Sequence, residues 1–511
     1  MLVTAKATPL LQRPTPSDIA APSLRLSAIV GLIAIAVSIA GSWVPSLWGD
    51  EAASVMSATR TLPSLWGMLA HVDAVHGAYY LGLHAWVGVA GSSPFAVRLP
   101  SAIAAGITAG GVVWLAQRFG STQFAIGAGL LTALLPRLTY AGAEARAYAF
   151  DAALATLLCV TLVELVVSGR LSRRGWVAYG AVLTVGIYTF VYFGLMILVA
   201  AVVVLATGRL RAQWRRWAIA TLVAVTASTP ILLFAFLERG QVAFLAHRDV
   251  VNVDAVLVQM WFGSSAVAVA AGGLIILAVV CWVRDILRAR GRGVPAGPSV
   301  EIIALPWLLL PMGLLIAISP LLAGYTARYG TLSAPAAALL MTAGVRRIGE
   351  VVRRRWVPVV AVIAVAACVV PVWVSQRTPY AKNGSDWNEI AATITAEAVR
   401  GDAIVFDEGV RPSRRPRLAM STNPTSFSAV RDPTLKTPYA EGVSWHDVTY
   451  TVADAISSGR FAGVDRVWMV EYATASHVDT WGMADLAVAG YRQVRAIRGH
   501  RSVVYLYERA P

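Results

Sequence analysis

Long apolar runs alternate with short basic segments along most of the chain. A hydrocarbon core about 30 Å thick needs roughly 20 apolar residues per helix, and a helix satisfies its own backbone hydrogen bonds in lipid. We place the boundary between two adjacent runs at Tyr188–Tyr192, in a stretch of mixed apolar and aromatic residues. The pattern predicts about eleven spanning helices, near 24–44, 94–116, 122–138, 147–167, 175–190, 192–208, 217–237, 263–283, 302–319, 328–345 and 357–375.

The composition agrees with a lipid environment. Of the 511 residues, 57% are hydrophobic and only 14% are charged, whereas soluble proteins carry roughly 25% charged residues. The net charge of +15 does not indicate nucleic-acid binding, because the arginines gather at predicted helix ends and no base-reading module is recognisable. Cys159, Cys281 and Cys368 lie in apolar runs, which is typical of small buried hydrophobes and predicts neither a disulfide framework nor a metal cluster.

The arginines also predict the topology, because Lys and Arg gather in short cytoplasmic loops. Residues 1–23 are expected to form a cytoplasmic tail, followed by a retained signal-anchor helix whose apolar run is too long for a cleaved signal peptide. An odd number of spans then puts the C-terminus outside. The cytoplasmic basic clusters would be those at 170–174, 209–216, 284–292 and 346–355. The outer loops would hold seven acids and three histidines: Asp50, Glu51, Asp73, Glu144, Glu238, Asp249, Asp254, His71, His76 and His247.

Two regions lie outside the predicted transmembrane domain of residues 24–375. The first outer loop, 45–93, contains two amphipathic segments at 62–70 and 78–89, for which we predict helices along the membrane surface. From residue 376 the long apolar runs cease, and we expect an extracytoplasmic α/β domain over 376–511 without a Gly-rich phosphate loop. Its predicted elements are a helix at 386–399, strands at 403–407, 466–470 and 502–507, and irregular chain at 410–445.

Two adjacent carboxylates, Asp50 and Glu51, follow the first predicted span on its outer side. Adjacent acids in a partly dehydrated site can have their pKa values pushed apart, which suits one for general-base work and the other for holding a cation or a sugar hydroxyl. Helix capping is the plain alternative, with Asp50 as the N-cap of a surface helix that Glu51 continues.

Further polar residues follow on the same predicted side. An arginine at a helix entrance can be a mere interface anchor, but its planar fork also pairs well with phosphate oxygens. Arg146 is therefore a candidate for holding the phosphate of a lipid carrier, and Arg328 is a second. The accompanying candidates are His76, Tyr79, Tyr80, Glu144, Tyr148 and Tyr329.

These motifs, in this order, resemble bacterial membrane glycosyltransferases of the GT-C fold, in the protein-mannosyltransferase-like group (family 39). The resemblance covers roughly residues 30–345, and the C-terminal α/β domain is similar to that of actinobacterial mannosyltransferase-like members. The family's usual His-Pro-Pro is His76-Gly77-Ala78 here, and Ala147 stands where proline is common. The matching motifs are Trp48-Gly49-Asp50-Glu51-Ala52, His76 with Tyr79-Tyr80, Arg98-Leu99-Pro100-Ser101, Glu144-Ala145-Arg146-Ala147-Tyr148, and Ala327-Arg328-Tyr329 with Pro335.

The resemblance implies a multi-pass enzyme of the inner (plasma) membrane that transfers a sugar from a polyprenyl-phosphate donor. Mannose is the sugar that the resemblance favours. The acceptor would be an envelope glycan, lipoglycan or protein at the outer face, attacked with inversion. Asp50 would be the base and Glu51 would orient the sugar or acceptor, while Arg146 and Arg328 would neutralise the phosphate. No soluble nucleotide is needed; the use of a divalent cation stays open, and no metal ligands are assigned.

Three other functions are compatible with the same residues. An arabinofuranosyltransferase of the same fold would carry the same motifs. A transporter or flippase of a lipid-linked sugar would also place acids and arginines along the membrane, but such proteins usually have internal repeats, and we find none. An inactive scaffold whose outer domain binds glycans is a third alternative.

Overall fold

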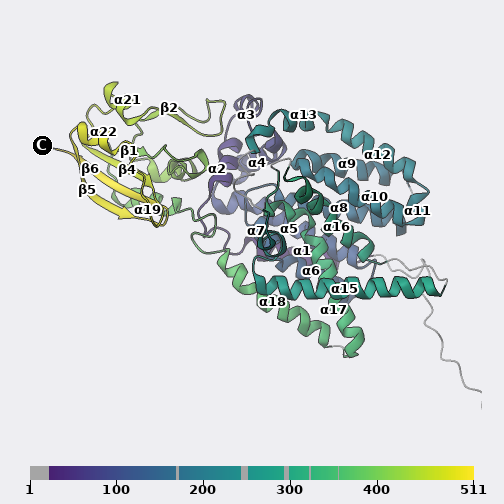
Figure 1. The fold of residues 1–511 in the computed structure, drawn as a ribbon. Coiled ribbons are helices and arrows are strands. Elements are labelled where there is room, and N and C mark those ends of the chain that lie inside the picture. The colour runs from purple at the N-terminus through teal and green to yellow at the C-terminus, as the bar shows by residue number, and fades with distance from the viewer. Residues whose placement is uncertain are drawn as a thin grey trace, which may run out of the picture.

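The computed structural model describes residues 22–167, 172–242, 251–292, 299–320, 324–354 and 356–510. Residues 1–21 of the predicted cytoplasmic tail, together with His247 and Asp249, lie outside this part of the chain. In the described part, a helical bundle carries a sheet-containing C-terminal unit at one end (Figure 1). Figure 1 places helix α11 (Gly208–Arg211), in the predicted cytoplasmic basic cluster at 209–216, at the opposite end from that sheet.

Helix occupies each of the eleven predicted positions. The helix break between Thr189 and Val191 confirms the division of the aromatic stretch into two segments. The bundle elements are α1 (Leu24–Ile39), α5 (Pro94–Ala116), α6 (Thr122–Leu134), α7 (Pro136–Gly142), α8 (Tyr148–Val167), α9 (Arg173–Thr189), η2 (Val191–Leu195), α10 (Met196–Ala206), α11, α12 (Trp214–Ala227), α13 (Thr229–Leu237), η3 (Arg239–Val242), η4 (Ala255–Gln259), α15 (Ser265–Gly291), α16 (Glu301–Ile318), η5 (Ala327–Ser333), α17 (Ala334–Val352) and α18 (Val357–Ser375).

The described helices make the protein a polytopic membrane protein. Four of them, in α5, α8, α15 and α16, are long and apolar enough to cross a membrane. The total rises to as many as six if two bent pairs, α6–α7 at 60° and α12–α13 at 53°, each form one span. Shorter apolar helices lie at Leu24–Ile39, Val191–Ala206 and Val359–Ser375, whereas α9 and α17 include arginines that lower their hydropathy. The figure of eleven spans stays a prediction.

Glycines allow helices α1 and α5 to pack closely. A Cβ at Gly106 would lie 2.8 Å from the carbonyl oxygen of Gly31, and one at Gly110 would lie 2.8 Å from that of Ser27. Small residues spaced four apart are the usual means of close helix contact in lipid, where apolar burial alone gives little drive for association. The Gly106/Gly110 face therefore sets the distance between α5 and α1.

The loop predicted to be the first outer loop forms helices, as the amphipathic segments indicate. They are α2 (Gly49–Ala58), α3 (Leu62–Leu69), η1 (Ala74–His76) and α4 (Gly77–Ala90). The two predicted amphipathic segments correspond to α3 and α4. Figure 1 shows α2 between the helical bundle and the C-terminal sheet, so this loop joins the two parts of the molecule.

The C-terminal unit is α/β, as the helix and strand alternation predicts. Its main sheet has the order β1-β4-β6-β5, with β1 and β4 parallel and the remaining pairs antiparallel. The elements are α19 (Trp387–Glu397), β1 (Ala403–Phe406), η6 (Pro412–Arg414), α20 (Leu418–Thr422), η7 (Pro424–Phe427), β2 (Leu435–Thr437), β3 (Val448–Thr449), α21 (Val452–Ser457), β4 (Arg466–Tyr472), α22 (Met483–Val488), β5 (Tyr491–Arg498) and β6 (Ser502–Arg509).

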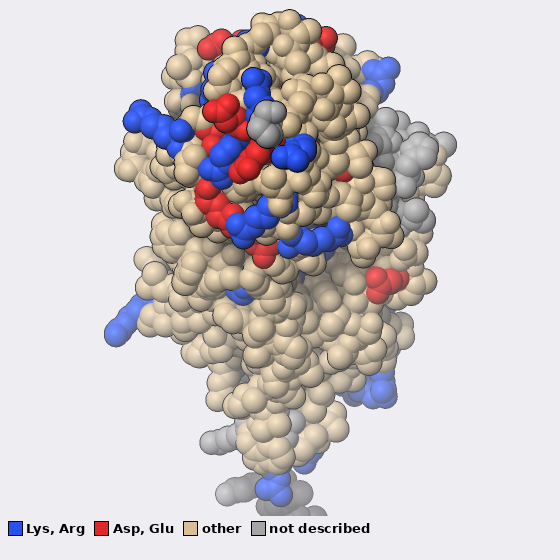
Figure 2. Space-filling view, turned by 90° about the vertical axis from the view of Figure 1, so that its left-hand side faces the viewer, with Lys and Arg blue, Asp and Glu red and all other residues tan. Residues whose placement is uncertain are grey.

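The two faces of this sheet have different neighbours. Side chains such as Phe406, Trp468 and Leu506 belong to one apolar cluster with α19, α20 and the outer-loop helices. The opposite face packs with α21 and α22. Lys, Arg, Asp and Glu side chains gather on the outer end of this unit, whereas the visible flank of the bundle is largely without them (Figure 2). The change in composition at residue 376 is therefore visible as a change of surface.

Enlarging Gly110 should loosen the bundle. We expect Gly110→Leu to lower the midpoint of thermal unfolding in detergent, because overpacking costs about 1–3 kcal/mol where a Cβ already meets the Ser27 carbonyl. Gly272→Leu is the matched control, since a Cβ at Gly272 meets no atom within 4 Å. Equal midpoints for the two variants would contradict the packing role of Gly110.

Candidate active site

The acidic pair lies in the first turn of α2. The helix begins at Gly49, so Trp48 occupies the N-cap position without a capping side-chain hydrogen bond. The alternative of Asp50 as N-cap is therefore wrong, because Gly49 already belongs to the helix and Asp50 is its second residue. Carboxylates in a first turn are favoured by the partial positive charge of the helix N-terminus.

Asp50 forms an ion pair with Arg328, a residue 278 positions away in the chain. Arg328 Nη1 donates to Asp50 Oδ2 at 2.5 Å, and the Asp50 side chain keeps 24% of its surface exposed. Burial acts to raise the pKa of Asp50, but the charges of Arg328 and Arg146 outweigh it and hold the pKa below its usual value. The carboxylate is thus ionised at neutral pH, and part of the Asp50 side chain stays exposed.

Glu51 points to a different partner. Its carboxylate accepts two bonds from Arg98, Nε to Oε1 at 2.7 Å and Nη2 to Oε2 at 2.6 Å, and a third from the Ala145 N–H at 2.9 Å. Both charged side chains are fully buried. Arg98 also donates to carbonyl oxygens of the loop after α1, at Pro45 (2.9 Å) and Ser46 (3.2 Å). Substrate contact by Glu51 stays a prediction, while its observed contacts are those of a residue that fixes the loop.

Arg146 contacts both the backbone of Asp50 and the side chain of His76. Its Nη2 is 3.1 Å from His76 Nε2, and its Nη1 donates at 3.4 Å to the Asp50 carbonyl and to Ser54 Oγ. Burial, together with the charge of Arg146, lowers the pKa of His76 to about 3, although Asp50 opposes this. A neutral His76 accepts the Arg146 bond. The phosphate-binding role of Arg146 stays a prediction.

A cleft of about 440 Å³ opens beside Arg328. Two arginines, Arg137 and Arg328, line it together with Trp48. Arg328 lies 5.4 Å from the centre of that ring, which suits a cation–π contact. The lining residues are Trp48, Pro136, Arg137, Tyr140, Glu144, Gln259, Gly263, Thr326, Ala327, Arg328, Val372, Ser375, Gln376, Ala381 and Asn383.

Tyr148 and Tyr329 form an aromatic wall next to Arg328. Their ring centres are 6.1 Å apart, and both rings contact Phe190, at 6.0 Å and 4.9 Å. Arg328 lies 6.0 Å from the Tyr148 ring. The structure thus places four candidate residues, Asp50, Arg328, Tyr148 and Tyr329, near one another, while their roles toward substrate stay predictions. Sequence analysis assigns Phe190 no role.

Tyr79 and Tyr80 face inward from α4. Tyr80 donates its hydroxyl to Asp73 Oδ2 at 3.1 Å and is fully buried. Tyr79 is also buried, with its ring 5.9 Å from that of Phe150. Neither lines the cleft, so their predicted contact with substrate remains untested.

Glu144 sits at the cleft with two partners that the motifs do not reveal. Its Oε1 accepts the Trp48 indole N–H at 3.1 Å. The positive charge of Lys382 acts on it from the segment after α18, where the ammonium lies 3.4 Å from the centre of the Tyr140 ring. Burial lowers the pKa of Lys382 to about 8, against the opposing charges of Glu144 and Glu51. Sequence reasoning missed Lys382 and Arg137 because neither belongs to a recognisable motif.

Metal ligation was predicted for none of the candidate residues. No group of three or more His, Cys, Asp or Glu side chains in the described part of the chain could hold a metal ion. The use of a divalent cation therefore stays an open expectation.

Solved structures of other proteins share the fold of this chain. No protein-family model and no curated protein matches the sequence, but solved structures match the architecture. ArnT from Cupriavidus metallidurans in the apo state has a TM-score of 0.52 at 14% identity, covering 94% of this chain and 97% of that one. The same enzyme bound to undecaprenyl phosphate has a TM-score of 0.52 at 13% identity, with the same coverage.

The arabinofuranosyltransferase AftD from Mycobacteria also matches, with a TM-score of 0.50 at 15% identity. The match covers 96% of this chain but 40% of AftD. These likenesses show that the chain has the GT-C fold, a polytopic helical domain with a C-terminal sheet-containing unit.

Removing the charge of Glu51 should destabilise the protein strongly. We expect Glu51→Gln to lower the free energy of unfolding by about 3–5 kcal/mol, because Arg98 would remain buried without its anion. The measurement is chemical unfolding in detergent. Glu350→Gln is the control: Glu350 pairs with Arg347 at 3.1 Å but is half exposed, so its loss should cost less than about 1 kcal/mol. Similar losses for both variants would contradict this account of Glu51.

Proposed function

Starting from the GT-C fold that this chain shares with ArnT and AftD, we propose that the protein is a glycosyltransferase. It transfers a sugar from a polyprenyl-phosphate donor to an acceptor hydroxyl at the outer face of the plasma membrane. The observation that carries the proposal is the ionised, partly exposed Asp50 paired with Arg328 at 2.5 Å, with Arg328 facing a large cleft.

In the proposed reaction Asp50 acts on the acceptor hydroxyl and Arg328 on the donor phosphate. The acceptor oxygen attacks the anomeric carbon while Asp50 takes its proton. The bond between the anomeric carbon and the phosphate oxygen breaks, and the electron pair leaves with the polyprenyl phosphate. Attack opposite the leaving group inverts the anomeric centre. Arg328 stabilises the negative charge that grows on the phosphate, where a fixed cation lowers the barrier.

Arg328 is suited to that role by its position. It lies in η5, its guanidinium lies over the rings of Trp48 and Tyr148, and the residue lines the cleft. Arg146 supports Asp50 from the other side, because it donates to the Asp50 carbonyl and to His76. We propose Arg328 as the main phosphate ligand, with Arg146 as a second cation and Glu51 as a positioning residue.

The donor and acceptor follow from the proposed class. ArnT has been solved with undecaprenyl phosphate, which supports a polyprenyl-phosphate donor here. We propose mannose as the sugar and a glycan, lipoglycan or protein as the acceptor, with arabinofuranose as the alternative to test in parallel. The orientation that this requires, with the N-terminus cytoplasmic and residues 376–511 outside, is open to cysteine labelling of the C-terminal unit from the outer side.

Asp50→Asn should abolish most transfer. A positioned base contributes typically about 10²–10⁴-fold, so we expect kcat with a defined polyprenyl-phosphate sugar and acceptor to fall by that factor while the protein still inserts into the membrane. The assay should compare mannosyl and arabinofuranosyl donors. Full activity of Asp50→Asn would exclude the mechanism, and retained lipid-linked sugar transport without transfer would favour a flippase.

Arg328→Gln should change both rate and pH dependence. Because the charge of Arg328 helps hold the Asp50 pKa below its usual value, the base form is present above that pKa and is lost as the pH falls through it. Removing Arg328 should move the acid limb of kcat/KM to higher pH and lower kcat by about 10²–10³-fold. Arg347→Gln, whose partners Glu350 and Asp285 lie at the end of α17 and in α15, should shift neither.

A further inference from the structure

The C-terminal unit contacts the beginning of α2 directly. A Cβ built on Gly49 would lie 2.3 Å from the Ser413 carbonyl oxygen, so only glycine fits against the backbone there. Next to it, Ser385 Oγ donates to the Leu47 carbonyl at 2.7 Å. The first turn of α2, which carries Asp50, therefore contacts one segment of the C-terminal unit, and the residues just before the helix contact a second.

The other end of α2 is tied to the same unit. Arg60, 1% exposed, donates from Nη1 to the Gly442 carbonyl at 2.9 Å and from Nη2 to the Ser444 carbonyl. Thr59 Oγ1 lies 3.1 Å from the Tyr439 hydroxyl, and Arg60 lies 5.7 Å from the centre of the Tyr439 ring. Both ends of one ten-residue helix thus contact the C-terminal unit.

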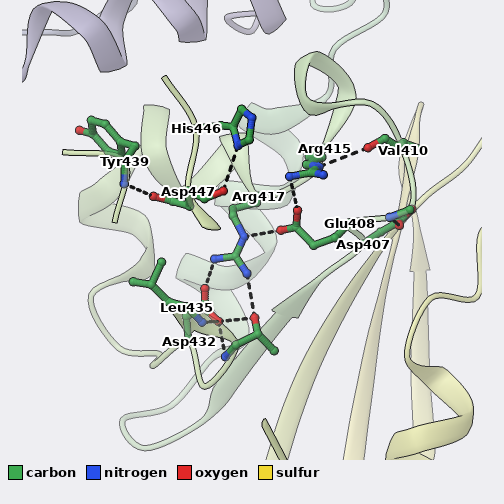
Figure 3. A network of polar contacts seen from close by, with 12 residues as sticks. Asp407, Glu408, Val410, Arg415, Arg417, Asp432, Leu435, Tyr439, His446 and Asp447 are labelled. Carbon is green, nitrogen blue, oxygen red and sulfur yellow. Dashed lines mark hydrogen bonds and ion pairs between the residues drawn. The ribbon is translucent and has the colours of Figure 1, made fainter. Parts of the chain in front are cut away.

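Both contacting loops are fixed within the C-terminal unit. Arg417 and Arg415 share the carboxylate of Glu408, at 2.5 Å and 2.7 Å, and Arg417 also pairs with Asp432 (Figure 3). In the same view, Asp447 accepts the Tyr439 N–H at 2.7 Å. Buried, shared ion pairs of this kind resist rearrangement because breaking one leaves an unpaired charge.

We propose that the C-terminal unit positions the helix that carries Asp50, holding it at Gly49 and at Arg60 so that the carboxylate stays opposite Arg328. This inference rests on the proposed function, in which Asp50 is the base. Geometry of this kind matters because a displacement of about 1 Å at a reacting group can cost roughly 10² in rate. Gly49 and Arg60 act through Asp50 and are positioning residues.

Gly49→Ala tests the first contact. The new methyl group must displace either α2 or the 412–414 loop, and we expect kcat to fall by about 10²-fold. The acid limb of the kcat/KM profile should also move to higher pH, because Asp50 loses part of its contact with Arg328. A variant that merely folds less well would lose active enzyme without any shift of this limb. An unchanged limb in folded protein would overturn the proposal.

Arg60→Ala tests the second contact without using activity. We expect faster amide hydrogen exchange over residues 49–58 in the full-length protein. Arg460→Ala is the matched control, because Arg460 also donates to two carbonyl oxygens, at Pro433 and Leu435, and also lies over a tyrosine, Tyr450, but entirely within the C-terminal unit. Equal exchange over 49–58 in the two variants would overturn the proposal.

The two hypotheses fail separately. An active Asp50→Asn would exclude Asp50 as the base, whereas the exchange result for Arg60→Ala would still report whether the C-terminal unit holds α2. An inactive Asp50→Asn with normal kcat, acid limb and exchange in both positioning variants would keep the proposed function and exclude the positioning role.

Discussion

The buried ion pair between Glu51 and Arg98 is the constraint on which the rest of the site depends. Both side chains are fully enclosed, and their remaining hydrogen bonds go to the loop after α1 and to the Ala145 N–H. One pair thereby joins α1, α2, α5 and the segment before α8. Because an unpaired charge there would cost several kcal/mol, the turn that presents Asp50 has few other conformations open to it.

Hydropathy and charge predict the architecture well for a physical reason. A spanning helix must be apolar over its length, so the bundle can be located by local composition alone. The C-terminal strands β1, β4 and β6 are likewise predicted from short apolar runs. Strand β5 is missed because its residues are mostly exposed and it carries Arg492, Arg495 and Arg498, a pattern that has no apolar face. The predicted irregular stretch also contains short helices, α20 among them.

The candidate site is only half visible in the sequence. Ordered motifs identify Asp50 and Arg328, yet nothing local indicates that they pair, or that Glu51 points to Arg98 instead of the cleft. The helix boundary also matters: a start at Gly49 rather than at Glu51 removes the capping role of Asp50. Such features depend on contacts between distant segments, which periodicity and composition do not encode.

Lys382 gives the C-terminal unit a second connection to the chemistry. This lysine follows the last helix of the bundle, and its side chain is buried, with 1% exposed. Its charge acts on Glu144, which lines the cleft. A chain shortened after α18 would lose that cation and leave a buried acid without it. The charge state of Glu144 in the helical bundle therefore depends on a residue that the C-terminal unit supplies.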